Sequence, residues 1–381
     1  MFMNFDHFNV ADPILRAIKD MGYTTPTAIQ QKAIPIVLNG QDIIGCAQTG
    51  TGKTAAFAIP LLQRIVQESP QRPQRKPVCL VLAPTRELAL QIKENFDGYN
   101  KYTKRRIAVI FGGVSQKSQV DQLNKGVDVL IATPGRLLDL IGQGLLKIDQ
   151  VRYLVLDEAD TMLDMGFVHD IKKVLKFLPA KRQTLFFSAT MPKNIRSFAH
   201  TVLTDPIEVN AQVVSSAATT VHQSIFFVEK KQKMKLLHHL LNDSGVEQSL
   251  VFTRTKYGAD RLAKQLLKRG IQTASIHGNK TQNARQKALS NFKSGAVRVL
   301  IATDIAARGI DIHDLSHVVN FDLPNDSETY VHRIGRTGRA GKDGVAISFC
   351  SQEERKELKD IQKLIGFQLK VQEHDFVAEE V

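Results

Sequence analysis

A glycine-rich decapeptide near the start of the chain carries the first candidate chemistry. Residues 45–54 read GCAQTGTGKT and lie between an apolar "DIIG" and a helix-compatible "KTAAFAI". Such a loop can aim backbone N–H groups at phosphate oxygens, and the following helix N-terminus adds a favourable dipole. Lys53 would then reach the outer phosphates and Thr54 would hold Mg²⁺. The alternative is a glycine-rich turn with an exposed lysine, because Ala47 stands where such loops usually have glycine.

An acidic segment, "VRYLVLDEAD" (151–160), carries the second candidate chemistry. An apolar strand that ends in Asp157 and Glu158 matches the segment with which phosphate-loop enzymes bind Mg²⁺. Asp157 would bind the metal directly or through water, and Glu158 could orient and deprotonate an attacking water. An isolated Asp-Glu pair is more often a solvated loop, but the two segments together favour an ATPase.

Length and composition narrow the class of protein. A chain of 381 residues is too long for one ordinary core, so we expect two domains. The formal charge of +13 points toward a polyanionic partner such as RNA or DNA. The start "MFMNFDHFNV" lacks a secretory signal and no apolar run is long enough to span a membrane, so we expect a cytoplasmic protein. The three cysteines show no paired spacing and indicate neither disulfides nor a zinc site.

Short apolar runs that stop at small or hydroxyl residues must position these segments. Such unalternating runs suit strands buried on both faces, and the segments between them have helical periodicity. A parallel α/β arrangement follows, with ligands beyond the carboxyl ends of the strands. The runs are "VCLVLAPT" (78–85), "DVLIATP" (128–134), "YLVLDEAD" (153–160), "TLFFSAT" (184–190), "SLVFTRT" (249–255) and "RVLIATD" (298–304).

Two helix boundaries and one linker can also be predicted. Asp12 is a candidate N-cap, with Gly22 after the last turn of its helix. Ser351 and Glu354 form a candidate capping box before a second helix. The stretch "NAQVVSSAATTVHQS" (210–224) has no Lys, Arg, Asp or Glu and favours a linker over a surface strand.

Together these segments resemble the DEAD-box family of ATP-dependent RNA helicases, within superfamily 2. "DEAD" at 157–160 accompanies the phosphate loop, and Ala47 now fits, since alanine is normal there in this family. The resemblance covers nearly the whole chain, and "RQTLFFSATMP" and "TTVHQSIFFV" look nearest to the bacterial RhlE-like subgroup. The other matching segments, in family order, are "GYTTPTAIQ" (22–30), "PTRELA" (84–89), "GG" (112–113), "TPGR" (133–136), "SAT" (188–190), "VFTRT" (251–255), "ATDIAARGIDI" (302–312) and "YVHRIGRTGRAG" (330–341).

The resemblance implies an α/β fold of two tandem RecA-like domains, each a mostly parallel sheet flanked by helices, with a cleft between them. It implies RNA-stimulated ATP hydrolysis, with Mg²⁺, coupled to domain closure and to local, sequence-independent unwinding or remodelling. Alternatives are an ATP-dependent RNA clamp with little unwinding and a DNA helicase of the same superfamily. We expect a monomer that binds RNA and no membrane. The domains expected are 1–208 with the adenine-reading segment, linker 209–221, domain 222–366 and tail 367–381.

The family's functional residues can be placed on matching positions of this chain. Catalysis would fall to Lys53, Glu158, Arg336 and Arg339, with both arginines supplied by the second domain. ATP contacts are expected at Phe5, Tyr23, Gln30, Ala47, Gln48, Thr49, Gly50, Thr51, Gly52, Lys53, Thr54, Gly309 and Asp311, and metal contacts at Thr54 and Asp157. Backbone contacts to RNA are expected at Pro84, Thr85, Arg86, Gly113, Thr133, Arg136, Arg254, Gly278, Arg285 and Thr303. Coupling between the two sites is expected at Asp160, Ser188, Thr190, His332 and Arg333.

Overall fold

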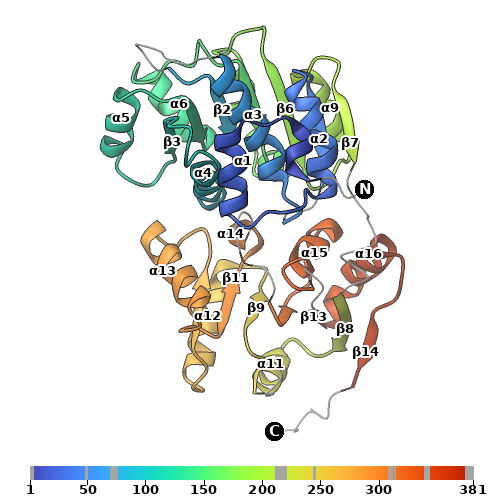
Figure 1. Ribbon diagram of the computed structural model, residues 1–381. Coiled ribbons are helices and arrows are strands. Elements are labelled where there is room, and N and C mark those ends of the chain that lie inside the picture. The colour runs from blue at the N-terminus through green and yellow to red at the C-terminus, as the bar shows by residue number, and fades with distance from the viewer. Residues whose placement is uncertain are drawn as a thin grey trace. The chain divides into compact units, whose positions relative to one another are not determined.

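The chain divides into two compact units, Met1–Gln212 and Val213–Val381. The computed structural model describes residues 4–47, 50–68, 76–210, 221–242, 246–307, 312, 315–338 and 344–373 (Figure 1). None of the helices in these ranges is long and apolar enough to cross a membrane.

The first unit is a seven-stranded sheet with helices packed against it. Its strand order is β3-β4-β2-β5-β6-β1-β7, and every neighbouring pair is parallel. The elements are η1 (Phe5–Phe8), α1 (Asp12–Asp20), α2 (Ala28–Leu38), β1 (Ile43–Cys46), α3 (Lys53–Glu68), β2 (Cys79–Leu82), α4 (Arg86–Tyr99), β3 (Ile107–Ile110), α5 (Lys117–Asn124), β4 (Val129–Ala132), α6 (Pro134–Gly142), β5 (Tyr153–Leu156), α7 (Ala159–Asp164), α8 (Val168–Leu175), β6 (Gln183–Ser188), α9 (Lys193–Val202) and β7 (Ile207–Asn210).

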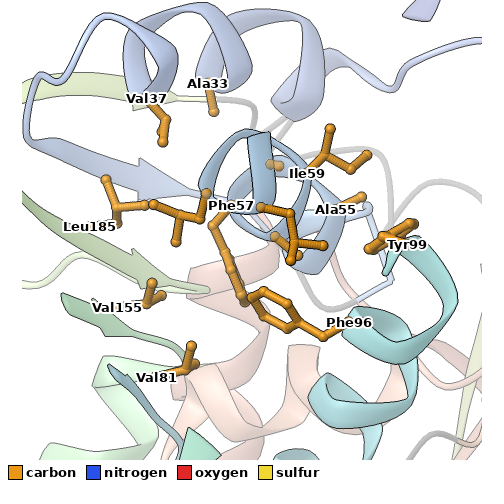
Figure 2. Close-up of a cluster of buried hydrophobic side chains, with 14 of the residues drawn as sticks. Ala33, Val37, Ala55, Phe57, Ile59, Val81, Phe96, Tyr99, Val155 and Leu185 are labelled. Carbon is orange, nitrogen blue, oxygen red and sulfur yellow. The ribbon is translucent and has the colours of Figure 1, made fainter. Parts of the chain in front are cut away.

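Helix α3 starts at the phosphate loop, and most of its residues are buried in the core. Phe57 of α3 packs against Phe96 of α4, with ring centroids 6.1 Å apart, and against Phe187 of β6 at 5.5 Å. Figure 2 shows this cluster, in which Ala33 and Val37 of α2 approach α3 from another side. Burial of one such aromatic side chain contributes roughly 1.5–3 kcal/mol. The core therefore fixes the helix end at which Lys53 lies.

The second unit repeats this arrangement with its own seven-stranded parallel sheet. Its order is β10-β11-β9-β12-β13-β8-β14, so β8 to β13 occupy the places of β1 to β6. The elements are β8 (Val221–Phe227), α11 (Lys233–Leu241), β9 (Ser249–Phe252), α12 (Lys256–Leu267), β10 (Thr273–Ile276), α13 (Gln282–Lys293), β11 (Val299–Ala302), α14 (Asp304–Ala307), β12 (His317–Asn320), α15 (Ser327–Ile334), β13 (Gly344–Cys350), η2 (Gln352–Glu354), α16 (Arg355–Ile365) and β14 (Lys370–Gln372).

The predicted parallel α/β architecture is confirmed, but three boundaries differ from the expectation. Strand β7 ends at Asn210 and β8 begins at Val221, so both ends of the predicted linker (209–221) are strand residues, and 211–220 lie outside the described residues. Part of the predicted tail (367–381) forms β14, which pairs with β8 because the edge of the sheet offers unpaired backbone groups. Helix α1 begins at Asp12 itself, with Ala11 as its N-cap.

Candidate nucleotide and RNA site

The phosphate loop connects β1 to α3 and depends on its glycines. Gly50 and Gly52 have φ of 84° and 89°, in the left-handed region that favours glycine. A Cβ on Gly52 would lie 2.3 Å from Nε2 of Gln30, so a glycine at this position also leaves room for the Gln30 amide. Gln48 and Thr49 of the predicted loop lie outside the described residues.

Lys53 is the residue of this loop whose surroundings most favour an anionic ligand. It is only 6% exposed, and its Nζ is buried without a hydrogen-bond partner among the described residues. Burying an ammonium group is costly unless a counter-charge compensates it. Because Lys53 also stands at the N-terminus of the 16-residue helix α3, a bound phosphate would receive both the charge and the helix dipole.

The acidic pair lies directly after β5, next to the strand that carries "SAT". Asp157 is 2% exposed, and its Oδ1 accepts a hydrogen bond from the backbone N–H of Glu158 at 3.0 Å. Burial raises the pKa of Asp157 to about 6, the ammonium of Lys53 opposes this shift and the carboxylate of Glu158 adds to it. A pKa this high means that the surroundings disfavour the ionised carboxylate, so a bound cation would stabilise it.

Glu158 has a strained backbone. Its φ and ψ are 49° and 52°, in the left-handed region that a side chain with a Cβ rarely adopts. Such a conformation costs roughly 1–2 kcal/mol. Strain of this kind is concentrated at functional sites, where it aims a side chain that a relaxed backbone would turn elsewhere.

Asp160 joins the acidic segment to the "SAT" segment inside the first unit. Its Oδ2 accepts hydrogen bonds from the backbone N–H groups of Ala189 at 3.1 Å and Thr190 at 2.9 Å, and from Oγ1 of Thr190 at 3.1 Å. Ser188 Oγ donates to the carbonyl oxygen of Thr190 at 2.6 Å, and the N–H of Ala47 donates to the carbonyl of Ser188 at 3.1 Å. The phosphate loop, "DEAD" and "SAT" thus form one connected network.

Gln30 connects the adenine-reading segment to the phosphate loop, a contact that we did not predict. Its Oε1 accepts from the N–H of Thr27 at 2.9 Å, and its Nε2 donates to the carbonyl of Gly52 at 3.1 Å. Thr27 adds a second link by donating from Oγ1 to the carbonyl of Thr51 at 2.8 Å. The capping-box pattern of Thr27 and Gln30 indicates the bond between these two residues but not the bond to Gly52. One N–H and one lone pair of the Gln30 amide remain for a base.

Phe5 and Tyr23, the aromatic residues expected at the base, lie at a hollow on the first unit. Phe5 is 4% exposed and meets Phe8 edge to face at 6.1 Å, whereas Tyr23 is 42% exposed. The hollow has a volume of about 310 Å³, which is within the size range of small-molecule sites. Its lining comprises Asn4, Phe5, Asp6, Leu15, Ile18, Lys19, Tyr23 and Thr24.

The expected RNA residues of the first unit gather at one half of the sheet's carboxyl edge. They follow β2, β3 and β4, which are neighbours, while the nucleotide segments follow β5, β6 and β1, also neighbours. These loops contact one another. Arg136 Nη2 donates to the carbonyl of Val114 at 3.1 Å. The guanidinium of Arg86 packs against Gly113, where an added Cβ would lie 2.1 Å from Nη2 of Arg86. Pro84 precedes Thr85, and Thr85 and Thr133 are the N-caps of α4 and α6.

The second unit places its expected RNA residues in the same way. Arg254, Gly278 and Thr303 follow β9, β10 and β11, which are neighbours in the sheet, and Arg285 lies on α13. A Cβ on Gly278 would meet nothing within 4 Å, so this loop is open to a partner.

Arg333 has a role inside the second unit that sequence reasoning missed. It is 1% exposed; its Nε and Nη2 bind Asp304 at 2.5 and 2.9 Å, and its Nη1 donates to Asn320 Oδ1 at 3.0 Å. These bonds position Arg333 among its neighbours in the second unit, and its predicted link to the acidic segment of the first unit stays a prediction. His332 and Arg336 line a small cavity together with Asp304 and Phe252. Gly309, Asp311 and Arg339 lie outside the described residues.

A phosphate loop, an acidic strand end and two like parallel sheets define a nucleotide-binding protein of the RecA-like type. The family model of DEAD/DEAH box helicases matches residues 27–198, and that of the helicase conserved C-terminal domain matches residues 232–341. The chain belongs to the DEAD-box family of ATP-dependent RNA helicases, because relatives well above 30% identity match almost all of it.

Two curated relatives illustrate this similarity. The DEAD-box ATP-dependent RNA helicase CshA of Bacillus subtilis is 43% identical over 95% of this chain and 72% of its own length. The ATP-dependent RNA helicase CshA of Listeria monocytogenes is 44% identical over 94% of this chain and 68% of its own. The predicted likeness to the RhlE-like subgroup stays a prediction.

Solved structures agree on the fold of two tandem RecA-like domains. Dbp5 of S. cerevisiae bound to RNA and ADP BeF3 matches with a TM-score of 0.87 and 33% identity, over 97% of this chain and 95% of that one. A DEAD box protein from Methanococcus jannaschii matches with a TM-score of 0.55 and 38% identity, over 98% and 99% of the two chains.

Proposed function

We propose that this helicase closes its two units on RNA when ATP and RNA bind together, separates short duplexes locally without reading their sequence, and reopens after RNA-stimulated ATP hydrolysis. The observation that carries the proposal is the buried Nζ of Lys53, which has no hydrogen-bond partner among the described residues and stands at the start of α3. The arrangement of nucleotide loops on one half of a sheet edge and RNA loops on the other supports the coupling of the two ligands.

The first unit would bind and activate the nucleotide. Lys53 neutralises the outer phosphates, and the strained Glu158 orients and deprotonates the attacking water. Thr54 and Asp157 supply the hard oxygen ligands that Mg²⁺ prefers, and the raised pKa of Asp157 fits a carboxylate that awaits a cation. Mg²⁺, when bound there, neutralises charge on the phosphates.

The second unit would complete the site when the two units close. Arg336 and Arg339 stabilise the charge that develops during phosphoryl transfer, so hydrolysis depends on closure. His332 and Arg333 link this segment to the acidic and "SAT" segments, and Arg333 also binds Asp304 within its own unit. Because RNA and ATP both favour the closed state, each ligand tightens the binding of the other.

The RNA loops would contact phosphates and sugars, since their residues are mostly glycines, hydroxyls and arginines. Contacts to 2′-hydroxyl groups favour RNA over DNA. The two alternative functions, an ATP-dependent RNA clamp and a DNA helicase, are distinguished by the test below. The proposal also includes action as a monomer in the cytoplasm, which sedimentation and cell fractionation check.

The test measures the ATPase rate without nucleic acid, with single-stranded RNA and with single-stranded DNA, together with the separation of a short RNA duplex. We expect RNA stimulation in the wild type and its loss in Lys53→Ala and Glu158→Gln. The exposed Lys172→Ala and Glu94→Gln are matched controls that should behave like the wild type. Equal stimulation by DNA would favour the DNA helicase, turnover without strand separation would favour the clamp, and wild-type rates in the two site variants would refute the assigned site.

A further inference from the structure

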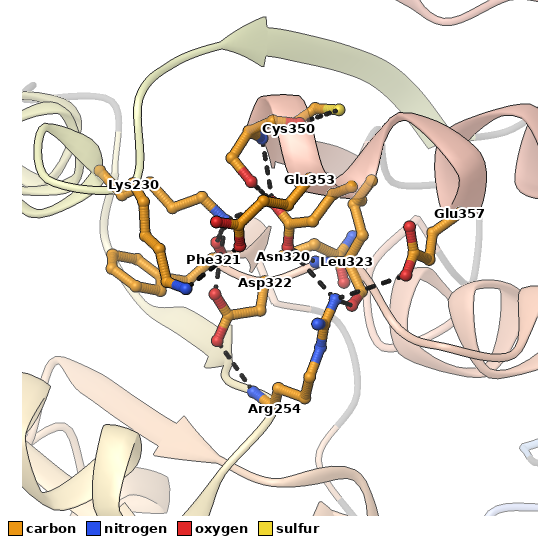
Figure 3. Close-up of polar contacts among 12 residues, drawn as sticks. Lys230, Arg254, Asn320, Phe321, Asp322, Leu323, Cys350, Glu353 and Glu357 are labelled. Atoms are coloured by element: carbon orange, nitrogen blue, oxygen red, sulfur yellow. Dashed lines mark hydrogen bonds and ion pairs between the residues drawn. The ribbon is translucent and has the colours of Figure 1, made fainter.

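Arg254, an expected RNA contact, is held by acceptors of its own unit (Figure 3). Its Nη2 donates to the carbonyl oxygen of Leu323 at 3.1 Å and lies 3.5 Å from Oε1 of Glu354 and 4.0 Å from Oε1 of Glu357. Its backbone N–H donates to Oδ2 of Asp322 at 3.0 Å. The backbone of Arg254 is therefore fixed independently of the guanidinium, which can change partners while the loop stays in place.

Glu354 is the fixed part of this network. Its Oε2 binds Nζ of Lys233 at 2.6 Å and accepts from the N–H of Ser351 at 2.9 Å and from Oγ of Ser351 at 2.8 Å, and its Oε1 accepts from the N–H of Leu323 at 3.0 Å. Lys233 and Glu354 are both buried, so breaking this pair would leave a charge uncompensated. Glu354 therefore stays where it is when Arg254 moves.

Glu357 is the exchangeable part. Its carboxylate reaches Arg254 only at 4.0 Å, and its Oε2 is buried without a hydrogen-bond partner among the described residues. The side chain of Arg254 is 40% exposed, so an incoming anion can reach it. Both acidic residues lie beyond residue 341, where the match to the helicase family model ends; Glu354 is the last residue of η2 and Glu357 lies on α16.

We propose that Glu357, supported by Glu354, competes with RNA phosphate for the guanidinium of Arg254 and so makes α16 a brake on RNA affinity. The inference rests on the proposed function, because it takes Arg254 as an RNA contact. Carboxylate and phosphate present the same fork of oxygens to a guanidinium. Since the contacts to Glu354 and Glu357 are long and partly exposed, they are weak enough for RNA to replace them.

The test measures the affinity of the full chain for a fluorescent single-stranded RNA in the presence of a non-hydrolysable ATP analogue. Glu357→Gln keeps the size of the side chain but removes its charge, and we expect RNA to bind about 1.5- to 5-fold more tightly. Glu353→Gln is the matched control, because Glu353 pairs with Lys230 at 3.2 Å and both side chains are 74% exposed. We expect its RNA affinity to be that of the wild type.

A double-variant cycle with Arg254→Gln separates competition for this arginine from general repulsion of RNA. Arg254→Gln alone should weaken RNA binding, and Glu357→Gln should have no further effect in that background. Weaker RNA binding by Glu357→Gln, an equal gain in Glu353→Gln, or a gain that persists without Arg254 would each overturn the inference. A wild-type affinity in Arg254→Gln would also overturn it. RNA-stimulated ATPase activity in the wild type would meanwhile leave the proposed function standing.

Discussion

Replacing Asp157 by Asn should stabilise the ligand-free first unit at neutral pH while it abolishes hydrolysis. Burial raises the pKa of Asp157 to about 6, above the value of about 3.9 expected in the unfolded chain. The folded state therefore holds this proton more tightly than the unfolded state. Stability is lost as the pH rises from about 4 to about 6, because the folded state must then ionise a buried carboxyl group. Two pKa units correspond to on the order of 3 kcal/mol.

The assay is urea unfolding of the wild type and Asp157→Asn between pH 4 and 8, with EDTA to remove metal ions. The difference in free energy of unfolding should be near zero at pH 4, grow in favour of the variant up to pH 6 and then level off. Asp149→Asn is the control, since the Asp149 side chain is 56% exposed. A difference that does not change with pH, or a variant less stable than the wild type at pH 7.5, would refute the reasoning.

Two further predictions concern the same unit. Asp160→Asn should lower the free energy of unfolding by about 2–4 kcal/mol. Both carboxylate oxygens of Asp160 accept hydrogen bonds, and an amide, with one oxygen, would leave a buried donor unpaired. Urea unfolding measures the loss, and a change below about 0.5 kcal/mol would contradict the network. Gly52→Ala should weaken ATP binding at least about tenfold, since the added Cβ meets Gln30 and the positive φ alone costs roughly 1–2 kcal/mol. Titration with a fluorescent ATP analogue measures it, and Gly142→Ala, where a Cβ meets nothing within 4 Å, should bind ATP normally.

Local patterns in the sequence predicted local structure well. The capping box of Ser351 and Glu354 is present, and Gly22 follows α1 with φ of 78°. These features depend on residues a few positions apart, so the sequence alone contains the necessary information. The parallel sheets were predictable for a similar reason, because each buried strand is a short continuous apolar run.

Contacts between distant segments could not be predicted in this way. The capping box does not indicate that Glu354 also bonds to Lys233 and Arg254, because these residues lie 121 and 100 positions earlier in the chain. Gln30 was expected at the base, but its bond to Gly52 depends on how α2 packs beside the phosphate loop. Strand β14 falls in the predicted tail, because three residues beside an open sheet edge carry too weak a pattern to predict a strand.

Lys53 and Lys233 occupy the same topological place in the two sheets. Each begins the helix that follows the equivalent strand, β1 or β8, and each is buried. An acidic residue follows the equivalent strand in both units, Asp157 after β5 and Asp322 after β12. Lys233, however, is neutralised by Glu354 at 2.6 Å and lies 3.4 Å from Asp322. Of the two equivalent lysines, Lys53 thus lacks a counter-ion among the described residues, whereas Lys233 has one within its own unit. The carboxylate of Glu354 occupies the position at which a nucleotide phosphate would otherwise bind in the second unit.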